Sequence, residues 1–373
     1  MSRASVGVVG GGIVGLTAGL ALAEAGRAVT VYERGEVASG STGRAAGVLY
    51  DAFTDAANAR LAAVSQRRFR ERSGEGAFSF TESPYVMLAR EGDEERAAAI
   101  EAAVERMRAN DRAVSLVDPA ELGERFPLVT DDVAVAAVAD GAGWGDPGDY
   151  ARLLAERFVA AGGDLRTETP VAVDPEGPSV VPEGGASEAH DAVLVAAGAH
   201  TKRLLADAGV AVPLKPYRVQ ALTSTTPYDG PMVYDATGGF YLRAHPTGLL
   251  AGDGTVPEEV DPDDWDPAAD EWFVDETRER LAERLEYDLT VDRAWAGLCV
   301  ATPDGEPLLG ELPEQEGLYV AAGWQGHGVM RAPGAGEAVA EEIRGGEGVP
   351  AFDPERFDGD ESFEIVEGMA VEE

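Results

Sequence analysis

The chain has 373 residues, a length more typical of two domains than of one. It carries 68 acidic against 30 basic residues, a formal net charge of −38, and only Lys202 and Lys215 among the basic residues are lysines. Such a surface would repel nucleic acid and anionic membranes, so we expect neither as a partner. The hydrophobic content of 45% leaves enough apolar material for a large core.

The acidic surplus is concentrated in two stretches. Residues 253–288 carry fifteen acids and three arginines, and residues 337–373 carry thirteen acids and two arginines. Abundant acid with almost no lysine resembles a halophilic composition, because molar salt shortens the Debye length to about 3 Å and screens the repulsion. We therefore expect exposed surface and a C-terminal tail in these stretches rather than functional sites.

The remaining composition points to a protein of the cytoplasm. Cys299 is the only cysteine, which excludes an intramolecular disulfide and a cysteine-built zinc site, and we predict no metal. The first residues enter a strand-like run at once, without the regions of a signal peptide. The longest apolar runs fall short of eighteen residues, so a membrane-spanning helix is not expected.

The first 33 residues predict a dinucleotide site. Residues 6–9 form a β-branched strand that leads into Gly10-Gly11-Gly12-Ile13-Val14-Gly15, a G-x-G-x-x-G sequence. Residues 16–25 favour a helix that stops at Gly26, and residues 28–32 a second strand that ends at Glu33. Gly10 permits the tight turn, Gly12 lets the backbone approach a pyrophosphate, and Gly15 lets the helix pack closely. The helix N-terminus favours phosphate, and Glu33 can accept hydrogen bonds from the ribose.

A second loop of small residues, Ser39-Gly-Ser-Thr-Gly-Arg-Ala-Ala-Gly47, follows. Its hydroxyls can wrap the second phosphate and the sugar-alcohol chain of FAD. Here the sequence resembles the FAD-dependent amino-acid and amine oxidoreductases of the D-amino-acid oxidase superfamily, which includes glycine oxidase and sarcosine oxidase. The resemblance continues through Asp146-Pro147 and its helix, the strand 192–195 with the turn 196–200, and the segments 213–220, 302–310 and 317–333.

The resemblance implies an α/β fold with two domains. A Rossmann-like FAD-binding domain with a parallel sheet would comprise residues 1–80, 141–215 and 295–350. An α+β substrate domain built on an antiparallel sheet would comprise residues 81–140 and 216–294, and residues 351–373 would form the acidic tail.

The resemblance also implies that FAD is bound without a covalent link. The residues it assigns to the cofactor are Gly10, Gly12, Ile13, Val14, Gly15, Glu33, Arg34, Ser41, Thr42, Arg44, Ala46, Gly47, Val171, Ala197, Gly198, Gly323, Gly326, His327, Gly328, Val329 and Met330. The 323–328 turn opens a helix to about residue 343, whose free N–H groups could stabilise negative charge on the reduced flavin. His327 is expected to contact the flavin, with a packing or capping role as the alternative. Cys299 could carry the flavin covalently, as a cysteine does in some relatives, but a buried thiol is the simpler interpretation.

The predicted substrate pocket departs from the family. Cations that hold the substrate carboxylate in relatives correspond to Cys299, Gly326 and Met330 here. Either another cation holds an acidic substrate, or the substrate has no carboxylate.

Residues 240–245 offer replacements, because strand alternation places Tyr241, Arg243 and His245 on one face. Arg243 could bind a carboxylate bidentately with Tyr241 as a hydrogen-bond donor, and His245 could act as a base. A surface arginine paired with acids and a structural histidine are the alternatives. These three residues and His327 are the catalytic candidates.

The sequence thus predicts an FAD-dependent oxidoreductase. Its substrate would be a small amino acid or N-methyl amino acid of the D-amino-acid, glycine or sarcosine type, oxidised at the C–N bond by hydride transfer to flavin N5. Either oxygen or an electron carrier would reoxidise the flavin, and the lack of a suitably placed lysine favours a dehydrogenase. A hydroxy-acid dehydrogenase and a non-catalytic FAD-binding assembly factor are the alternatives, and the oligomeric state is open.

Overall fold

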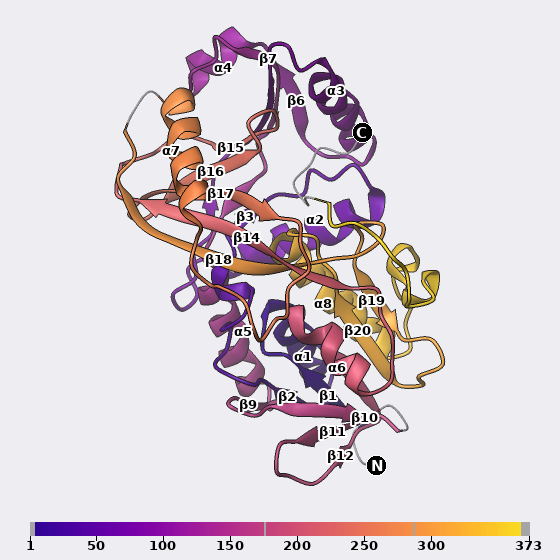
Figure 1. The fold of residues 1–373 in the computed structure, drawn as a ribbon. Coiled ribbons are helices and arrows are strands. Elements are labelled where there is room, and N and C mark those ends of the chain that lie inside the picture. Colours follow the sequence, from indigo (N-terminus) through magenta and orange to yellow (C-terminus); the bar gives the residue numbers. More distant parts are fainter. Residues whose placement is uncertain (1–3, 175–176, 286–287, 367–373) are drawn as a thin grey trace.

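The computed structural model describes residues 4–174, 177–285 and 288–366, which form two lobes, each built on one large β-sheet (Figure 1). One lobe contains a six-stranded sheet and the other an eight-stranded sheet. The mixed α/β class predicted from the sequence is confirmed.

The six-stranded sheet has the order β19-β20-β13-β1-β2-β9. Five of its strands are parallel and β19 is antiparallel to β20. The strands are β1 (Ser5–Val9), β2 (Ala28–Tyr32), β9 (Asp164–Arg166), β13 (Ala192–Val195), β19 (Leu308–Glu311) and β20 (Leu318–Ala322). The predicted strands 6–9, 28–32 and 192–195 coincide with β1, β2 and β13, whose continuous apolar runs suit a parallel sheet buried on both faces.

Helices from distant parts of the chain cover this sheet. The central helix α1 (Ile13–Glu24) is buried on nearly all sides and packs against α5 (Pro147–Ala160) and α8 (Gly328–Ile343). Also in this lobe are α2 (Ala56–Arg72), which packs on α8, and α6 (Thr201–Asp207). Two small sheets accompany them: β10 (Val171–Asp174), β11 (Ser179–Pro182) and β12 (Glu188–Ala189), and β3 (Val48–Leu49), β8 (Gly143–Trp144) and β4 (Thr81–Glu82).

The eight-stranded sheet has the order β18-β14-β17-β16-β15-β5-β7-β6 and is antiparallel except between β15 and β5. Its strands are β5 (Tyr85–Arg90), β6 (Val114–Val117), β7 (Val133–Ala139), β14 (Lys215–Ser224), β15 (Met232–Asp235), β16 (Phe240–His245), β17 (Gly248–Val256) and β18 (Val291–Ala301), accompanied by α3 (Glu94–Ala109), α4 (Pro119–Arg125) and α7 (Glu271–Leu285). The division of the chain into domains stays a prediction, and its boundary at residues 294/295 divides β18.

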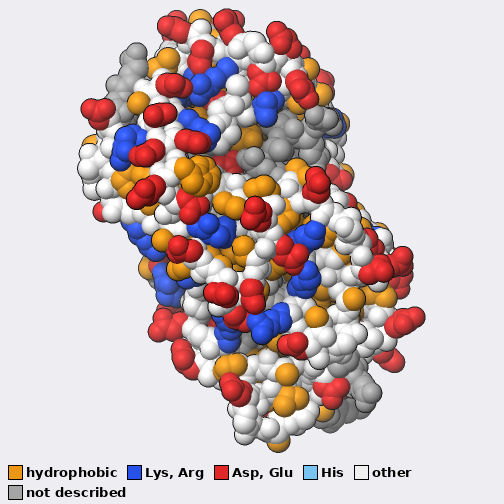
Figure 2. Space-filling view, viewed as in Figure 1, with side chains coloured by type: hydrophobic (Ala, Val, Ile, Leu, Met, Phe, Trp, Pro, Cys, Tyr) orange, Lys and Arg blue, Asp and Glu red, His pale blue; other side chains and the backbone are white. Residues whose placement is uncertain are grey.

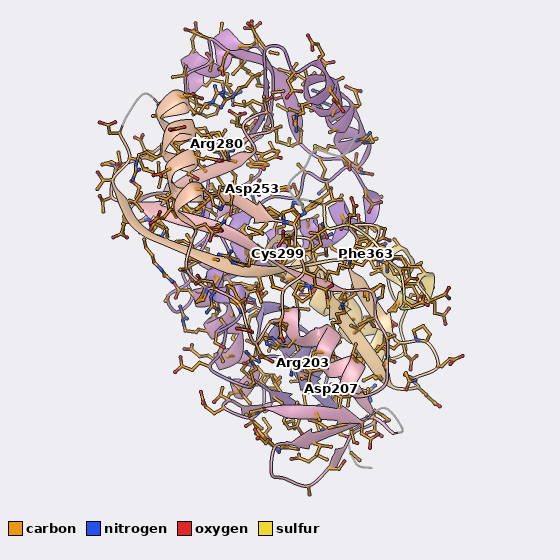
Figure 3. The ribbon with its side chains drawn as sticks, in the orientation of Figure 1. Arg203, Asp207, Asp253, Arg280, Cys299 and Phe363 are labelled. Atoms are coloured by element: carbon orange, nitrogen blue, oxygen red, sulfur yellow. The ribbon has the colours of Figure 1, made fainter. Side chains whose placement is uncertain are left out.

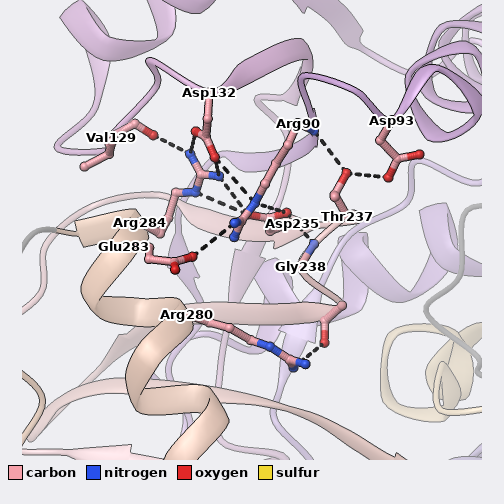
Figure 4. A network of polar contacts seen from close by, with 11 residues as sticks. Arg90, Asp93, Val129, Asp132, Asp235, Thr237, Gly238, Arg280, Glu283 and Arg284 are labelled. Atoms are coloured by element: carbon pink, nitrogen blue, oxygen red, sulfur yellow. Dashed lines mark hydrogen bonds and ion pairs between the residues drawn. The ribbon is translucent and has the colours of Figure 1, made fainter.

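A buried ion network fixes α7 to the sheet (Figure 4). Asp235 is 0% exposed and accepts hydrogen bonds from Arg90 Nε at 3.0 Å and Arg284 Nη2 at 2.8 Å. Arg284 also pairs with Asp132 at 2.9 Å. Because a buried carboxylate requires such partners, the network specifies how α7 packs on β5 and β15.

Acidic side chains are spread over both lobes on the face drawn in Figure 2, with basic side chains interspersed. Of the helices in the described part of the chain, none combines the length and apolar character that crossing a bilayer requires.

Candidate active site

A cavity of about 1050 Å³ lies between the two lobes. Ligand sites typically enclose roughly 300–1,000 Å³, so this cavity has room for a large cofactor. Its lining runs from the β1–α1 turn, past α6 and the loop before β3, to the eight-stranded sheet and the N-terminus of α8.

The β1–α1 turn can be built only with glycine at two positions. Gly10 has φ +120°, and a Cβ there would lie 2.3 Å from the Ala196 carbonyl oxygen. A Cβ on Gly15 would lie 2.1 Å from the carbonyl oxygen of Gly10, so α1 packs directly on the turn. The sequence requirement is therefore steric.

The N-terminus of α1 faces the cavity. Its N-cap residue, Gly12, has no side chain to cap the helix, and its first turn has no acidic residue, so the positive dipole end can bind an anion. Glu33 lies beside it and accepts hydrogen bonds from Gly11 N at 2.7 Å and Gly35 N at 2.9 Å.

The second glycine-containing loop folds over this turn. Thr42 Oγ1 accepts a hydrogen bond from Ile13 N at 3.2 Å. Gly47 has φ +67°, and a Cβ there would lie 2.0 Å from the Gly145 carbonyl oxygen. Arg44 donates to the carbonyl oxygens of Ser39 and Gly40, so it braces its own loop.

Most of the predicted cofactor residues line this one cavity. Exceptions are Gly15, which packs α1, Gly323, which packs on Thr302, and His327. The cavity-lining set comprises Gly10, Gly12, Ile13, Val14, Glu33, Arg34, Ser41, Thr42, Arg44, Ala46, Gly47, Val171, Ala197, Gly198, Gly326, Gly328, Val329 and Met330. A glycine cradle, an open helix N-terminus and an adjacent acid suit a dinucleotide such as FAD.

The 323–328 turn is held from behind by Arg331, which is 2% exposed. Its guanidinium donates to the carbonyl oxygens of Trp324 at 2.8 Å and His327 at 3.3 Å, and it pairs with Glu306 at 3.3 Å. Burial lowers the pKa of Arg331. With these carbonyls turned toward Arg331, the residues of the first turn of α8, Gly328, Val329 and Met330, line the cavity.

The eight-stranded sheet forms the opposite side of the cavity. We call its cavity-lining residues the sheet wall: Tyr217, Val219, Gln220, Ala221, Tyr241, Asp253, Thr255, Trp295, Gly297, Leu298, Cys299 and Val300. A Cβ built on Gly326 would lie 3.9 Å from Cys299 Sγ, so the 323–328 turn and the sheet wall approach each other closely.

The predicted catalytic residues are not all brought together. Tyr241 belongs to the sheet wall. Arg243, on the same strand, is 4% exposed, donates to the Ala46 and Ala244 carbonyl oxygens at 2.5 and 2.6 Å, and stacks over Trp144. His245 lies near the strand end with Nδ1 2.9 Å from Thr247 Oγ1. Neither of the latter two is among the described residues that line the cavity.

His327 also turns away from the cavity. Its ring packs edge-on against Phe53 and Tyr50, with centroid distances of 5.7 and 6.4 Å. Burial, with a smaller effect of Arg331, lowers the pKa of His327 to about 3. The imidazole is therefore neutral and packs in the core, where the alternative interpretation of the sequence places it.

Cys299 is a thiol of the sheet wall. Burial, and then Asp253, raises the pKa of Cys299 to about 12, while a hydrogen bond with Tyr217 opposes the shift. A protonated thiol is a poor nucleophile, which fits FAD bound without a covalent link.

The stretch 253–288 is not exposed throughout, contrary to our expectation. Asp253 is 5% exposed and lines the cavity. Asp263 lies at the nucleotide end of the cavity and pairs with Arg34 at 2.9 Å and Arg203 at 2.7 Å, and it lies 3.1 Å from His200 Nε2. The expectation failed because composition reports an average over a segment, whereas β17 carries one of its acids inward.

The tail also makes contacts that the sequence did not suggest. Phe352 is 1% exposed. Phe363 O accepts a hydrogen bond from Lys215 Nζ, and Val366 O accepts one from Gln325 Nε2 in the 323–328 turn.

Fold and cavity together define a two-lobed flavoprotein oxidoreductase with a dinucleotide cradle at one end and an enclosed sheet wall at the other. Residues 5–342 match the family described as FAD dependent oxidoreductase, and the chain belongs to that family. It is an FAD-dependent enzyme.

Individual relatives are similar along nearly the whole chain. Glycine oxidase of Geobacillus kaustophilus is 28% identical, over 91% of this chain and 93% of that one. Its crystal structure superposes with a TM-score of 0.84, covering 96% of this chain and 100% of that one at 26% identity. L-proline dehydrogenase from P. horikoshii gives a TM-score of 0.86 at 30% identity, covering 96% of this chain and 98% of that one.

Proposed function

We propose that the protein oxidises the carbon–nitrogen bond of a small amino acid or N-methyl amino acid. The observation that carries this proposal is the continuous cavity from the Gly10–Glu33 cradle to the sheet wall. The names of the relatives, glycine oxidase and L-proline dehydrogenase, support an amine donor.

FAD, when bound, supplies the acceptor for the two electrons and the hydrogen that leave the substrate carbon. Residues of the chain would bind FAD and stabilise its charge. The glycine cradle and Glu33 would hold the nucleotide, and the N–H groups at the start of α8 would stabilise the negative charge of the reduced flavin. The sheet wall excludes water from the substrate. The imine product then hydrolyses in water to a carbonyl compound and an amine.

Anaerobic titration of the yellow protein tests this proposal. D- and L-amino acids, glycine, sarcosine and dimethylglycine are added in turn, and at least one is expected to abolish the oxidised flavin absorption. If none does so while FAD stays bound, amine oxidation is refuted and a non-catalytic FAD-binding role becomes the better account.

We favour a dehydrogenase, which passes its electrons to a carrier, over an oxidase, which passes them to oxygen. Both lysines are engaged elsewhere, Lys202 with Glu259 and Lys215 with Phe363 O, and neither is among the described residues that line the cavity. Stopped-flow mixing of reduced protein with air-saturated buffer measures reoxidation, and oxidation by oxygen at the rate of turnover would contradict this version.

A further inference from the structure

The sheet wall contains an acid that the proposed function does not use. Asp253 lies on β17, is 5% exposed and lines the cavity. Figure 3 places it with Cys299 in the eight-stranded sheet, away from Arg203 and Asp207 of α6, which line the nucleotide end.

The backbone is distorted to hold Asp253 in this position. Its φ of +125° is one that side-chain-bearing residues rarely adopt. The register of β17 against β14 shifts here, with Gln220 opposite Asp253 but Arg218 opposite Val256, so β17 has an extra residue. Gln220 secures this bulge by donating from Nε2 to the Gly254 carbonyl oxygen at 3.1 Å.

The surroundings of Asp253 suit a positively charged ligand. Thr255 Oγ1 donates to Oδ1 at 3.0 Å. Tyr241 lies next to it, since Tyr241 pairs with Gly252 on the adjacent strand. Asp253 contributes to raising the pKa values of Tyr241 and Cys299, so these groups are neutral. A carboxylate beside a tyrosine ring can bind an ammonium group by charge and by cation–π contact.

The arginines that line the cavity are at its nucleotide end or, in the case of Arg44 beside Gly297 of the sheet wall, hydrogen-bonded to their own loop. Among the described lining residues, the arginines are Arg34 and Arg203, which pair with Asp263, and Arg44, which binds the carbonyls of its own loop. A substrate carboxylate next to Asp253 would be repelled by it, with none of the described lining arginines beside Asp253 to offset the repulsion. A substrate ammonium group in the same place would be attracted.

We propose that Asp253 binds the ammonium group of the substrate, and that among amino acids and their derivatives the enzyme prefers those whose carboxyl is uncharged, such as amides. This rests on the proposed function and specifies its substrate class. Asp253 then accepts one ammonium proton: the N–H bond breaks, an O–H bond forms on the carboxylate, and the amine keeps the electron pair. Only the neutral amine has the lone pair that assists loss of hydride from the adjacent carbon.

The experiment uses FAD-loaded wild type, Asp253→Asn and Asp253→Gly. Glycine suits a φ of +125° and so removes the carboxylate while relieving the backbone. Glu258→Gln is the matched control, because it removes an exposed acid just after the end of β17 that is not among the described residues lining the cavity. Thermal midpoints and FAD content establish that each variant is folded and loaded.

Two non-oxidisable probes, tert-butylammonium and acetate, are titrated against the flavin absorption spectrum. D-alaninamide and D-alanine, and sarcosine methylamide and sarcosine, are compared as donors. In wild type and in Glu258→Gln, the ammonium probe and the amides are expected to bind at least about tenfold tighter than acetate and the free acids, as the strength of charge-assisted hydrogen bonds implies. Both Asp253 variants should lose that preference.

The outcomes separate this inference from the proposed function. If acetate binds as tightly as tert-butylammonium in wild type, or if both Asp253 variants keep the cation preference within about twofold, a change too small for a lost charged hydrogen bond, the role of Asp253 is refuted. If tert-butylammonium binding depends on Asp253 but no amine reduces the flavin, the ammonium site stands and the proposed oxidation fails.

Discussion

Replacement of Arg331 by methionine tests whether the hydrogen bonds from its guanidinium hold the 323–328 turn in place. Arg331 donates to two carbonyl oxygens of that turn, to Asn58 Oδ1 at 2.5 Å, and pairs with Glu306 at 3.3 Å. Methionine keeps an unbranched stem of similar length and removes every donor.

The magnitude follows from what the substitution leaves behind. Removing one partner of a buried ion pair costs about 3–5 kcal/mol, and a buried acceptor left without a donor costs about 1–3 kcal/mol. Glu306 is 27% exposed, so water can partly replace the arginine at that acid. We expect the free energy of unfolding to fall by about 3–5 kcal/mol. We also expect FAD to dissociate at least about tenfold faster, since the turn positions the start of α8 and a factor of ten needs only about 1.4 kcal/mol.

Urea unfolding of the loaded and FAD-free protein measures the first quantity, and the rise in flavin fluorescence on release measures the second. Arg344→Met is the control, because Arg344 follows the same helix and forms an exposed ion pair with Glu341 worth at most about 1 kcal/mol. A loss in Arg331→Met no larger than that of the control, or FAD release at the wild-type rate, would refute the reasoning.

Three other predictions concern pH, backbone conformation and salt. The pKa of His327 is lowered from 6.5 to about 3, so its contribution to stability is fully present above pH 6.5 and is lost as the pH falls toward 3, by up to about 1.4 kcal/mol per pH unit. His327→Gln should therefore lose less stability than wild type between pH 6 and 4 in urea titrations at each pH, and equal losses would contradict a buried neutral imidazole. Gly47→Ala should abolish FAD retention after gel filtration, because φ is +67° and the new Cβ would lie 2.0 Å from Gly145 O. Gly26→Ala, with φ +85° and nothing within 4 Å of its Cβ, should cost only about 1 kcal/mol and stay yellow. The thermal midpoint should rise from dilute buffer to molar KCl, because screening relieves the repulsion of a net charge of −38; a midpoint that falls in calorimetry would contradict this.

The cofactor end could be predicted from the sequence because its requirements are local. Gly10 and Gly15 are fixed by contacts within one strand–turn–helix unit, and a Cβ at either position would collide with backbone. Gly47 needs a positive φ within its own loop. Short-range steric rules of this kind leave a readable pattern in the chain.

The substrate end could not be predicted in the same way, because long-range packing determines it. Alternation predicted Tyr241, Arg243 and His245 on one face of a strand, and residues 240–245 do form β16. The Arg243 guanidinium, however, donates to the Ala46 carbonyl, 197 residues away. The sequence predicts no role for Arg331, because that role depends on Asn58 and Glu306, which only the fold brings to it. No periodicity encodes these partners.

Asp253 shows most clearly what a composition can and cannot establish. The stretch that begins at Asp253 is acidic enough to indicate exposed surface, and most of its acids fit that interpretation. A bulge with positive φ turns this one acid into the cavity, where a carboxylate charge is costly instead of favourable. On the surface, an added carboxylate is hydrated and contributes to solubility. Inside, it must be compensated by hydrogen bonds or a cation. An ammonium substrate would provide such a cation, and Tyr241 beside Asp253 supports this interpretation.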